Sequence, residues 1–459
     1  MQVSRRQILA SGLAALQQRA PNVLLILADD LGSADTGFAG GGIPTPNIDR
    51  IALEGARLAN FYCTPLCTPT RASLLTGRNP VRYGLIYSVI RPWSPYGLPA
   101  GEHTMAESFR DAGYRTAIVG KWHLGHTNRR FLPNARGFHH FYGHVNAEID
   151  YFTHTKLDGL DWQRNGKGVR EEGYATDLLG AEAVRWLESR DRARPFFLYL
   201  PFNAVHSPMQ APEPLLAKYN AIGNRNRRAY AAMLDAMDTA IGRVLASLEA
   251  DGSLSNTIVV FLSDNGGALG QGARNGPLRA GKLTVYEGGV RACAAIRWPA
   301  HLPPGTSFTQ RMSVLDLFPT LCAAAGVKPG NRLPLDGRNL WPALTRGAAA
   351  PETSLFWAAK RNETQDKQHA VLLGDWKLVE SVSDDRKTTL ELFHLVEDPA
   401  EKNNVASANQ DVVARLRHEL DGWKNLHPRA DIDSSMIPHP GWSAPADYAT
   451  VAMDYEPAR

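Results

Sequence analysis

Four short apolar runs of the sequence each end in residues that could bind a metal ion or an anion. One such ending would mean little, since Asp and Asn after a strand are usually turn or capping residues. In open α/β sheets, however, ligands bind beyond the carboxyl ends of the strands, so four endings predict one shared site. The runs are residues 22–28, 115–120, 195–202 and 256–263, followed respectively by Asp29 and Asp30, by Lys121 and His123, by His206, and by Asp264 and Asn265.

These polar residues form two chemical sets. The first offers only oxygen ligands, which suit Ca²⁺ or Mg²⁺ better than zinc. The second, which includes Lys282 further along the chain, is cationic or can become so. At ~4 Å and an effective dielectric near 20, each contact between opposite charges is worth about 4 kcal/mol before desolvation. Both sets are satisfied together only by a metal and an anion, so the pattern predicts a metal-assisted site for a tetrahedral oxyanion.

Cys67 precedes a stretch that has the signals of a helix start. Thr68 suits the N-cap and Pro69 the first helical position, and Gly77 should end the helix. A cysteine at a helix N-terminus lies beside backbone N–H groups that favour an anion, and Arg71 lies one turn along. An ordinary thiol there should have a lowered pKa and act as a nucleophile. A cysteine protease is the alternative, but oxygen-rich metal ligands have no place in that chemistry.

The elements that must position these residues are predicted from hydrophobic patterning. The four apolar runs have the near-continuous character of parallel strands buried on both faces. Strands alternating with helices imply an α/β fold, with a large, mostly parallel sheet flanked by helices on both faces. Helical patterns lie between the runs, at residues 47–59, 104–112, 175–189 and 227–248.

After residue 313 the alternation of strand and helix patterns ends. A last helix of the main domain should end at Gly326, and linker-like segments rich in Gly and Pro follow. Short runs at 369–380 and 388–399 then predict a small antiparallel sheet, with a helix at 408–425 and an irregular tail. We therefore expect a catalytic domain over 21–345 and a small C-terminal α+β domain over 350–459.

Composition excludes several classes of protein. Hydrophobic residues make up 44% and charged residues 21% of the 459 residues, with a net charge of +4, which is typical of a soluble globular enzyme rather than a nucleic-acid binder. Four cysteines form neither a disulfide framework nor a C-x-x-C zinc pair. No run is long enough to span a membrane.

The N-terminus predicts export. Arg5 and Arg6 are followed by the apolar stretch from Ile8 to Leu16, the shape of a twin-arginine signal over residues 1–20. Such a signal would place the mature protein in the periplasm or outside the cell. The alternative is a surface helix on a cytoplasmic protein.

The segment CTPTR followed by ASLLTGR resembles the signature C-x-P-x-R…TGR of the formylglycine-dependent type I sulfatases, within the alkaline phosphatase superfamily. In that family the cysteine is oxidised after translation to formylglycine. The resemblance extends over ILADDLG, TPNIDRIALEG, GKWHLGH, AVHSP, SDNGG and PLRAGKLTVYEGGVR, and over the later ELFHLVEDPAEKNNVA. It covers residues 21 to about 408. Thr70 is the one departure, since serine is commoner there.

The resemblance implies a role for each site residue. Ca²⁺ would be held by Asp29, Asp30, Asp264, Asn265 and the modified Cys67. Arg71 and Lys121 would steady the formylglycine hydrate and the sulfate, and Lys282 would bind sulfate oxygens. His206 would protonate the leaving alcohol, and His123 would take the proton that allows sulfate to be expelled. A formylglycine-generating maturation enzyme is an implied partner.

Two other functions compete with sulfate-ester hydrolysis. The wider superfamily includes phosphomonoester and phosphonate hydrolases, which mostly use a Ser or Thr nucleophile and often two zinc ions. A catalytically inactive binder of sulfated glycans would have lost some of the ten site positions, and none is missing. The sequence therefore favours a sulfatase.

The substrate must be recognised by loops at the same rim. Residues 129–154, with His, Tyr, Phe, Asn and Asp, suit the hydroxyls and ring faces of a sugar, and Tyr151 and His154 are the candidate contacts. The alternative is a structural loop rich in aromatic residues. Together with residues 93–99, this loop is most similar to the arylsulfatase B type, which acts on N-acetylgalactosamine 4-sulfate. The resemblance implies a small or oligosaccharide sulfate ester as substrate.

Overall fold

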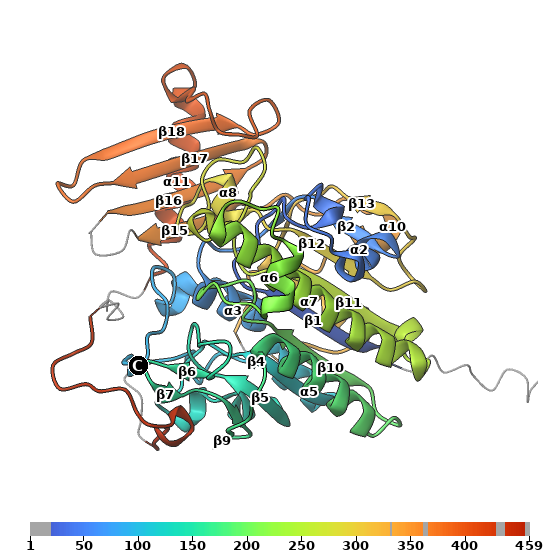
Figure 1. Ribbon diagram of the computed structural model, residues 1–459. Coiled ribbons are helices and arrows are strands. Elements are labelled where there is room, and N and C mark those ends of the chain that lie inside the picture. Colours follow the sequence, from blue (N-terminus) through green and yellow to red (C-terminus); the bar gives the residue numbers. More distant parts are fainter. Residues whose placement is uncertain (1–19, 331–332, 361–365, 428–436, 455–459) are drawn as a thin grey trace, which may run out of the picture.

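A large sheet forms the centre of the computed structural model, which describes residues 20–330, 333–360, 366–427 and 437–454 (Figure 1). Within this part of the chain the sheet has ten strands, in the order β13-β2-β12-β11-β1-β10-β4-β5-β8-β9. The four predicted strands are neighbours in its middle and run parallel. They are β1 (Asn22–Ala28), β4 (Arg115–Lys121), β10 (Phe196–Pro201) and β11 (Thr257–Ser263). The predicted α/β architecture is confirmed.

The strands outside this parallel centre were not predicted. They are β2 (Ala56–Leu58), β5 (His140–His144), β8 (Gln163–Arg164), β9 (Lys167–Gly168), β12 (Ala294–Arg297) and β13 (Thr306–Phe308). Strand β12 is antiparallel to both of its neighbours, which makes the sheet mixed. The helix predicted over 47–59 is correspondingly shorter, because α2 (Pro46–Leu53) ends before β2 joins the sheet.

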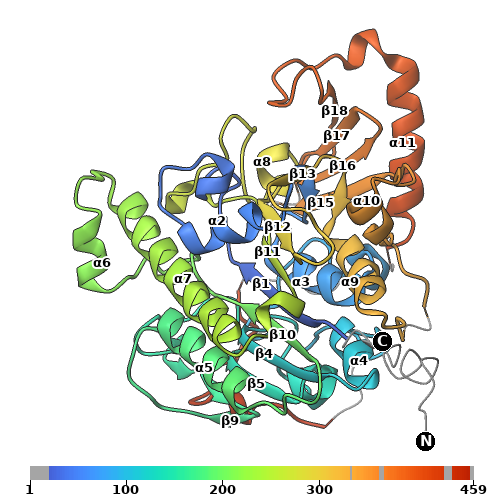
Figure 2. The ribbon, with the colours of Figure 1, turned by 90° about the vertical axis from the view of Figure 1, so that its right-hand side faces the viewer.

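Helices cover both faces of the large sheet (Figure 2). Alternate residues of β1 point into two separate cores, Leu24 and Ile26 into one and Val23 and Leu25 into the other. The first core contains α2, α5 (Ala175–Ser189) and α7 (Arg225–Ala250); the second contains α3 (Cys67–Thr76), α4 (Met105–Asp111) and α9 (Leu317–Ala325). The shorter elements are α6 (Glu213–Lys218), α8 (Glu287–Val290), α10 (Trp341–Arg346), and the strand pairs β3 (Phe61–Tyr62) with β14 (Met312–Ser313) and β6 (Thr155–Lys156) with β7 (Gly159–Leu160).

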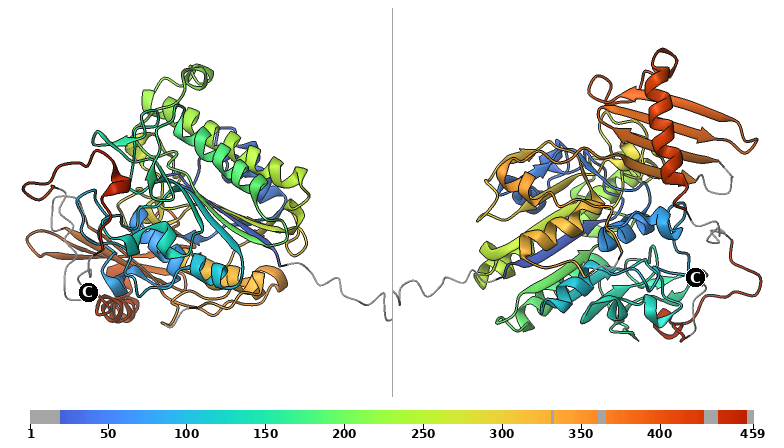
Figure 3. Two further views of the ribbon diagram at one scale, coloured as in Figure 1. Left: turned by 90° about the horizontal axis from the view of Figure 1, so that it is seen from below. Right: turned by 180° about the vertical axis from the view of Figure 1, so that it is seen from behind.

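A second sheet lies near the C-terminal end of the chain, as predicted. Its strands are antiparallel in the order β15 (Leu355–Lys360), β16 (Lys367–Leu373), β17 (Trp376–Val382) and β18 (Thr388–His394). Helix α11 (Gln410–Lys424) crosses one face of this C-terminal sheet (Figure 3, right). The other face packs against Val285, Tyr286 and Val290, which belong to the chain that follows Lys282.

The described part of the tail differs from the prediction. Residues 437–454 run back along the molecule instead of staying with the C-terminal sheet (Figure 1). The backbone N–H of Leu160 donates to the carbonyl of Ala446, and Tyr448 is buried in the second core of the large sheet. The tail predicted as irregular therefore covers the part of the molecule that contains β6, β7 and β9.

The export signal predicted over residues 1–20 lies, except for residue 20, outside the described residues, and it stays a prediction. The division into domains at about 345–350 stays a prediction as well. No helix in the described part of the chain is long and apolar enough to cross a membrane.

Helix α7 offers a matched test of what a buried ion pair contributes to this fold. Arg227 contacts the fully buried Asp35 at 2.6 Å, whereas Arg243 pairs with Asp177 at 2.8 Å with both side chains about half exposed. Arg227→Ala should lower the free energy of unfolding by about 3 kcal/mol, because it leaves a buried carboxylate without its cation. Arg243→Ala should change it by less than about 1 kcal/mol. Urea denaturation measures both, and equal effects would contradict this account.

Candidate active site

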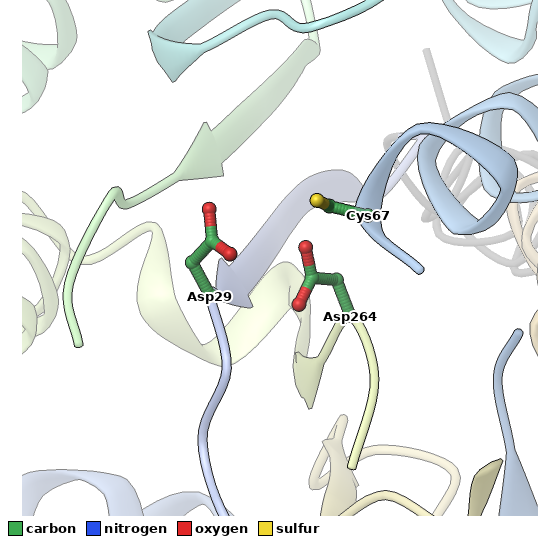
Figure 4. Close-up of side chains that lie close together, drawn as sticks. All are labelled: Asp29, Cys67 and Asp264. Carbon is green, nitrogen blue, oxygen red and sulfur yellow. The ribbon is translucent and has the colours of Figure 1, made fainter. Parts of the chain in front are cut away.

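The carboxyl ends of the central strands bring three ligand-type side chains together. Asp29 follows β1, Asp264 follows β11, and Cys67 begins α3. Figure 4 shows these three side chains pointing toward one another, and each offers one ligand atom within 4.8 Å of the others. Backbone hydrogen bonds continue the strand pairing past the sheet, since Asp264 N–H donates to Ala28 O and Asp29 N–H donates to Ala204 O.

The remaining predicted metal ligands lie in the same place. Asn265 donates from Nδ2 to Asp30 Oδ1 at 2.8 Å, and Asp30 N–H donates to Asp264 Oδ1 at 3.2 Å. Two buried oxygens, Asp29 Oδ1 and Asn265 Oδ1, have no hydrogen-bond partner among the described residues. An unsatisfied buried oxygen is costly, so a cluster containing two of them fits a hard cation such as Ca²⁺.

Cys67 is placed differently from the prediction. Helix α3 begins at Cys67 itself and has Leu66 at its N-cap; it ends at Gly77, which has φ +62°. The Thr68 hydroxyl does not cap the helix but donates to His123 O and accepts from Ile90 N–H. Cys67 is only 2% exposed, and burial raises the pKa of its thiol more than nearby lysines lower it. The expected lowering of its pKa is therefore wrong for the unmodified cysteine.

Three buried or nearly buried cations face the carboxylates. Arg71 Nη2 lies 3.1 Å from Asp29 Oδ2 and 3.0 Å from Asp264 Oδ2, and Lys121 Nζ also contacts Asp29 Oδ2. Burial alone would raise the pKa of Asp29, but these cations hold it below its ordinary value. Burial and the neighbouring Asp29 carboxylate raise the pKa of Asp264. Lys282 Nζ completes the set with a 2.8 Å hydrogen bond to Asp30 Oδ2.

The two predicted catalytic histidines have defined hydrogen-bonding partners. His123 is fully buried, and its Nε2 lies 2.9 Å from Ile90 O. Because a carbonyl can only accept, Nε2 carries the proton and Nδ1, which has no partner in the described structure, is left as a free base. Burial, together with Lys121 and Arg71, lowers the pKa of His123 well below its ordinary value, so this free base is neutral.

His206 lies beside Asp29 and Asp30. Its Nδ1 donates to Ser207 O at 2.8 Å, and its Nε2 lies 3.6 Å from Asp30 Oδ2. Burial and then Lys282 lower the pKa of His206, although Asp30 and Asp29 partly offset them. With its side chain 11% exposed, His206 borders the solvent side of the cluster together with Lys282, which is 13% exposed.

Glycines allow the loops of the site to approach one another closely. A Cβ on Gly266, directly after Asn265, would lie 1.8 Å from the backbone oxygen of Gly288. Gly120 has φ +134°, and a Cβ there would lie 1.9 Å from Pro201 O. Larger residues at these two positions would force apart the segments that carry Asn265 and Lys121.

One buried histidine near the site was missed in the sequence. His144 ends β5 beside Lys121, its register partner at the end of β4. Its Nδ1 donates to Asn146 O, and its buried Nε2 has no partner in the described structure. Burial, Lys121 and Arg71 lower the pKa of His144 well below its ordinary value. Its strand, HFYGH, lacks the apolar run that marked the other four strand ends.

Comparison with known proteins identifies the family. The family model described as Sulfatase matches residues 21–327, and that of the N-sulphoglucosamine sulphohydrolase C-terminal region matches residues 281–425. The chain belongs to the sulfatase family. The enzyme is a sulfuric ester hydrolase.

Several relatives are similar over most of their length. Arylsulfatase J of Mus musculus is 32% identical, with 89% of this chain and 76% of that protein covered. Arylsulfatase A of Bos taurus is 33% identical (98% and 95% covered), and N-acetylgalactosamine-6-sulfatase of Canis lupus familiaris is 35% identical (80% and 73%). These relatives do not confirm the predicted nearness to the arylsulfatase B type.

Solved structures share the fold. The crystal structure of Ps i-CgsB is 34% identical, has a TM-score of 0.83 and covers 92% of this chain and 96% of its own. The same protein is also known in complex with k-i-k-neocarrahexaose. A phosphonate monoester hydrolase of Agrobacterium radiobacter, 20% identical with a TM-score of 0.66 and covering 89% of this chain and 96% of its own, shows likeness of fold alone.

Tyr151 and His154, the predicted substrate contacts, lie inside the sulfatase fold. Each is 1% exposed. The Tyr151 hydroxyl donates to Asn203 O at 2.7 Å and His206 O at 2.8 Å, and the His154 ring stacks on Trp162. Their burial does not support direct contact with a substrate. Tyr151 instead holds the backbone of His206.

This placement makes Tyr151 a positioning residue. Tyr151→Phe should lower kcat on an aryl sulfate by about fivefold, because the loss of a buried hydrogen bond of about 1 kcal/mol lets His206 shift. Tyr174→Phe is the matched control, since Tyr174 stacks on Tyr151 but donates to Gln210 O, away from His206. Steady-state kinetics of both variants measures the difference. An unchanged kcat for Tyr151→Phe would contradict the positioning role.

Proposed function

We propose that this sulfatase hydrolyses sulfate monoesters of a carbohydrate, with formylglycine made from Cys67 as its nucleophile and Ca²⁺ as its metal. The observation that carries the proposal is the convergence of Cys67, Asp29 and Asp264, with three cations bonded to the surrounding carboxylates. A cysteine protease has no use for this ring of oxygen ligands. A formylglycine-generating enzyme would have to act on the chain before it folds, because Cys67 is buried in the folded protein.

The donor set fits a hard divalent cation. The carboxylates of Asp29, Asp30 and Asp264 and the amide oxygen of Asn265 would hold it, and the unpartnered Asp29 Oδ1 and Asn265 Oδ1 are free to do so. Bound there, Ca²⁺ would supply positive charge to neutralise the nucleophile and the sulfate. Formylglycine would supply, as its hydrate, two hydroxyls on one carbon, so that one can attack and the other can drive sulfate release.

The residues of the chain would then bind the anion and move protons. The ammonium groups of Lys121 and Lys282 are anchored by Asp29 and Asp30 respectively, and would stabilise charge on the sulfate oxygens. Arg71 is held more deeply, by Asp29, Asp264 and the Lys121 carbonyl, and would orient the modified Cys67. Held this way, the cations need little reorganisation when the substrate binds.

The two histidines would work on opposite sides of the reaction. The Nδ1–H of His206 is held by Ser207 O, so its Nε2 would first have to take up a proton from solvent and would then donate that proton to the leaving alcohol. Nδ1 of His123 would accept the proton whose removal lets sulfate leave. Its hydrogen bond from Nε2 to Ile90 O fixes the required tautomer.

Mass spectrometry tests the identity of the nucleophile. In active enzyme, the peptide that contains Cys67 should carry formylglycine. Its mass should then be about 18 Da lower than that of the same peptide with an unmodified cysteine. Cys67→Ser should still bind the metal but show only background turnover, because an ordinary serine ester cannot expel sulfate. Full activity with an entirely unmodified Cys67 would refute the mechanism.

Metal analysis tests the second part of the proposal. Chelation should abolish aryl sulfatase activity, and Ca²⁺ or Mg²⁺ should restore it, because all candidate ligands are oxygens. Asn265→Ala should weaken metal binding measured by calorimetry, whereas Asn220→Ala, at an exposed position after α6, should not. Stoichiometric zinc in active enzyme would instead favour the phosphomonoester or phosphonate hydrolase alternative, with which the chain shares its fold.

The substrate is proposed to be a sulfated glycan. This is supported by Ps i-CgsB, 34% identical over 92% of this chain, which is known in complex with a neocarrahexaose. A binder without catalysis is the remaining alternative, and turnover of any sulfated sugar excludes it.

We also propose that residues 1–20 direct export, on the evidence of Arg5, Arg6 and the apolar stretch that follows them. The mature enzyme would then lie in the periplasm or outside the cell. Recovery of active protein with an intact N-terminus from the cytoplasm of its own cells would contradict export.

A further inference from the structure

A cavity lies beside the segment that follows Lys282. It has a volume of about 700 Å³ and lies between the C-terminal sheet and the loop that continues from Lys282. Leu283 and Thr284 form one wall, immediately after the lysine that bonds Asp30. The wall of this cavity, the sheet cavity, thus includes the residue that directly follows Lys282 in the chain.

A single row of side chains across the C-terminal sheet forms the opposite wall. Ala359 pairs with Gln368, Gln368 with Ser381, and Ser381 with Thr389, so one residue comes from each strand from β15 to β18. Gln368 Nε2 also donates to Ser381 Oγ at 3.3 Å. The row is thus a continuous surface of an amide, two hydroxyls and a methyl group.

The position of this row within the sheet is informative. Two residues further along the same face, Trp357, Ala370 and Val379 form an apolar row that packs against Val285 and Tyr286. Side chains two residues apart on a strand point to the same face, so the polar row lies on the face that packs against Val285 and Tyr286. The face that docks the two parts of the molecule therefore changes from apolar to hydrogen-bonding where the sheet cavity begins.

The rim of the sheet cavity carries one exposed lysine, Lys387, and one acid, Asp366. Lys367 also lines the cavity, but it neighbours Gln368 on β16, so its side chain extends toward the opposite face of the sheet. Lys387 is exposed and forms no ion pair in the described part of the chain, which leaves its charge free for a ligand. Lys367 lies 5.0 Å from the ring centre of Tyr87, whose loop continues to Ile90, the partner of His123. Both walls are therefore attached to loops that hold catalytic residues.

We propose that the sheet cavity is a subsite for a second, acidic sugar unit of an oligosaccharide, next to the unit whose sulfate is removed. This inference rests on the proposed function. Neutral hydroxyl and amide groups would bind sugar hydroxyls, the side chains of Leu283 and Ala359 would contact a ring face, and Lys387 would bind a sulfate or carboxylate group. An uncharged monosaccharide or a small aryl group offers nothing for Lys387 to bind.

Comparison of a short substrate with a long one tests this inference. The probes are a small aryl sulfate and a panel of sulfated mono-, di- and hexasaccharides that includes k-i-k-neocarrahexaose. In the double variant Gln368→Ala/Lys387→Ala, kcat/KM for the best oligosaccharide should fall about tenfold, mainly through KM, while that for the aryl sulfate stays within about twofold. The charge reversal Lys387→Glu should have a larger effect, and Lys387→Arg should retain most of the wild-type value.

Lys402→Ala is the matched control, since Lys402 is an exposed lysine of the same region that does not line the sheet cavity. Thermal unfolding of each variant separates a folding defect from a loss of binding. Unchanged oligosaccharide kinetics, equal losses on both probes, or no preference of the wild type for oligosaccharides would overturn the subsite while leaving the sulfatase proposal intact. No turnover of any sulfate ester by the matured wild type would instead refute the proposed function, and the subsite with it.

Discussion

The constraint on which the site depends is charge balance in a buried space. Three carboxylates, those of Asp29, Asp30 and Asp264, lie close together, and each contacts at least one of three cations. Arg71 contacts both Asp29 and Asp264, Lys121 contacts Asp29, and Lys282 contacts Asp30. Three carboxylates and three cations sum to zero, so this set of six charged groups is balanced before any ligand binds. A divalent cation entering this set would add two positive charges, which makes an anion the natural accompanying ligand. Metal binding and sulfate binding are therefore expected to support each other.

The same balance explains why both histidines are neutral. A protonated imidazole beside Lys121 or Lys282 would add a fourth buried positive charge, and burial already disfavours it. Neutral His123 has a free lone pair at Nδ1, as a base requires. His206, nearer to Asp30 and to solvent, is better placed to take up a proton and pass it on. Two residues of one type thus receive different tasks from their surroundings.

Sequence patterns predicted the centre of this structure because parallel strands buried on both faces need continuous apolar runs. The polar residues that end those runs had to meet at the sheet edge, and they do. The short strand β5 has no such run, so His144 was missed. Tyr151 and His154 were assigned to the substrate from residue type and position in the sequence, which cannot separate an exposed loop from a buried one. The thiol of Cys67 was expected to be acidic because the sequence does not reveal how deeply a helix start is buried.

The C-terminal sheet contributes to the site through a short chain of contacts. The buried Lys377 ammonium lies 2.8 Å from a carboxylate oxygen of Glu287 and 2.9 Å from one of Glu401. The Glu401 carboxylate also accepts a hydrogen bond from the backbone N–H of Glu287. The next residue, Gly288, lies against Gly266, which follows the metal-site residue Asn265. A displacement of the C-terminal sheet would therefore be transmitted to α8, and from α8 both to the metal-site loop and to the segment that carries Lys282. Because a packed, glycine-lined contact cannot absorb such a shift, docking of the C-terminal sheet is part of what holds the catalytic groups in place.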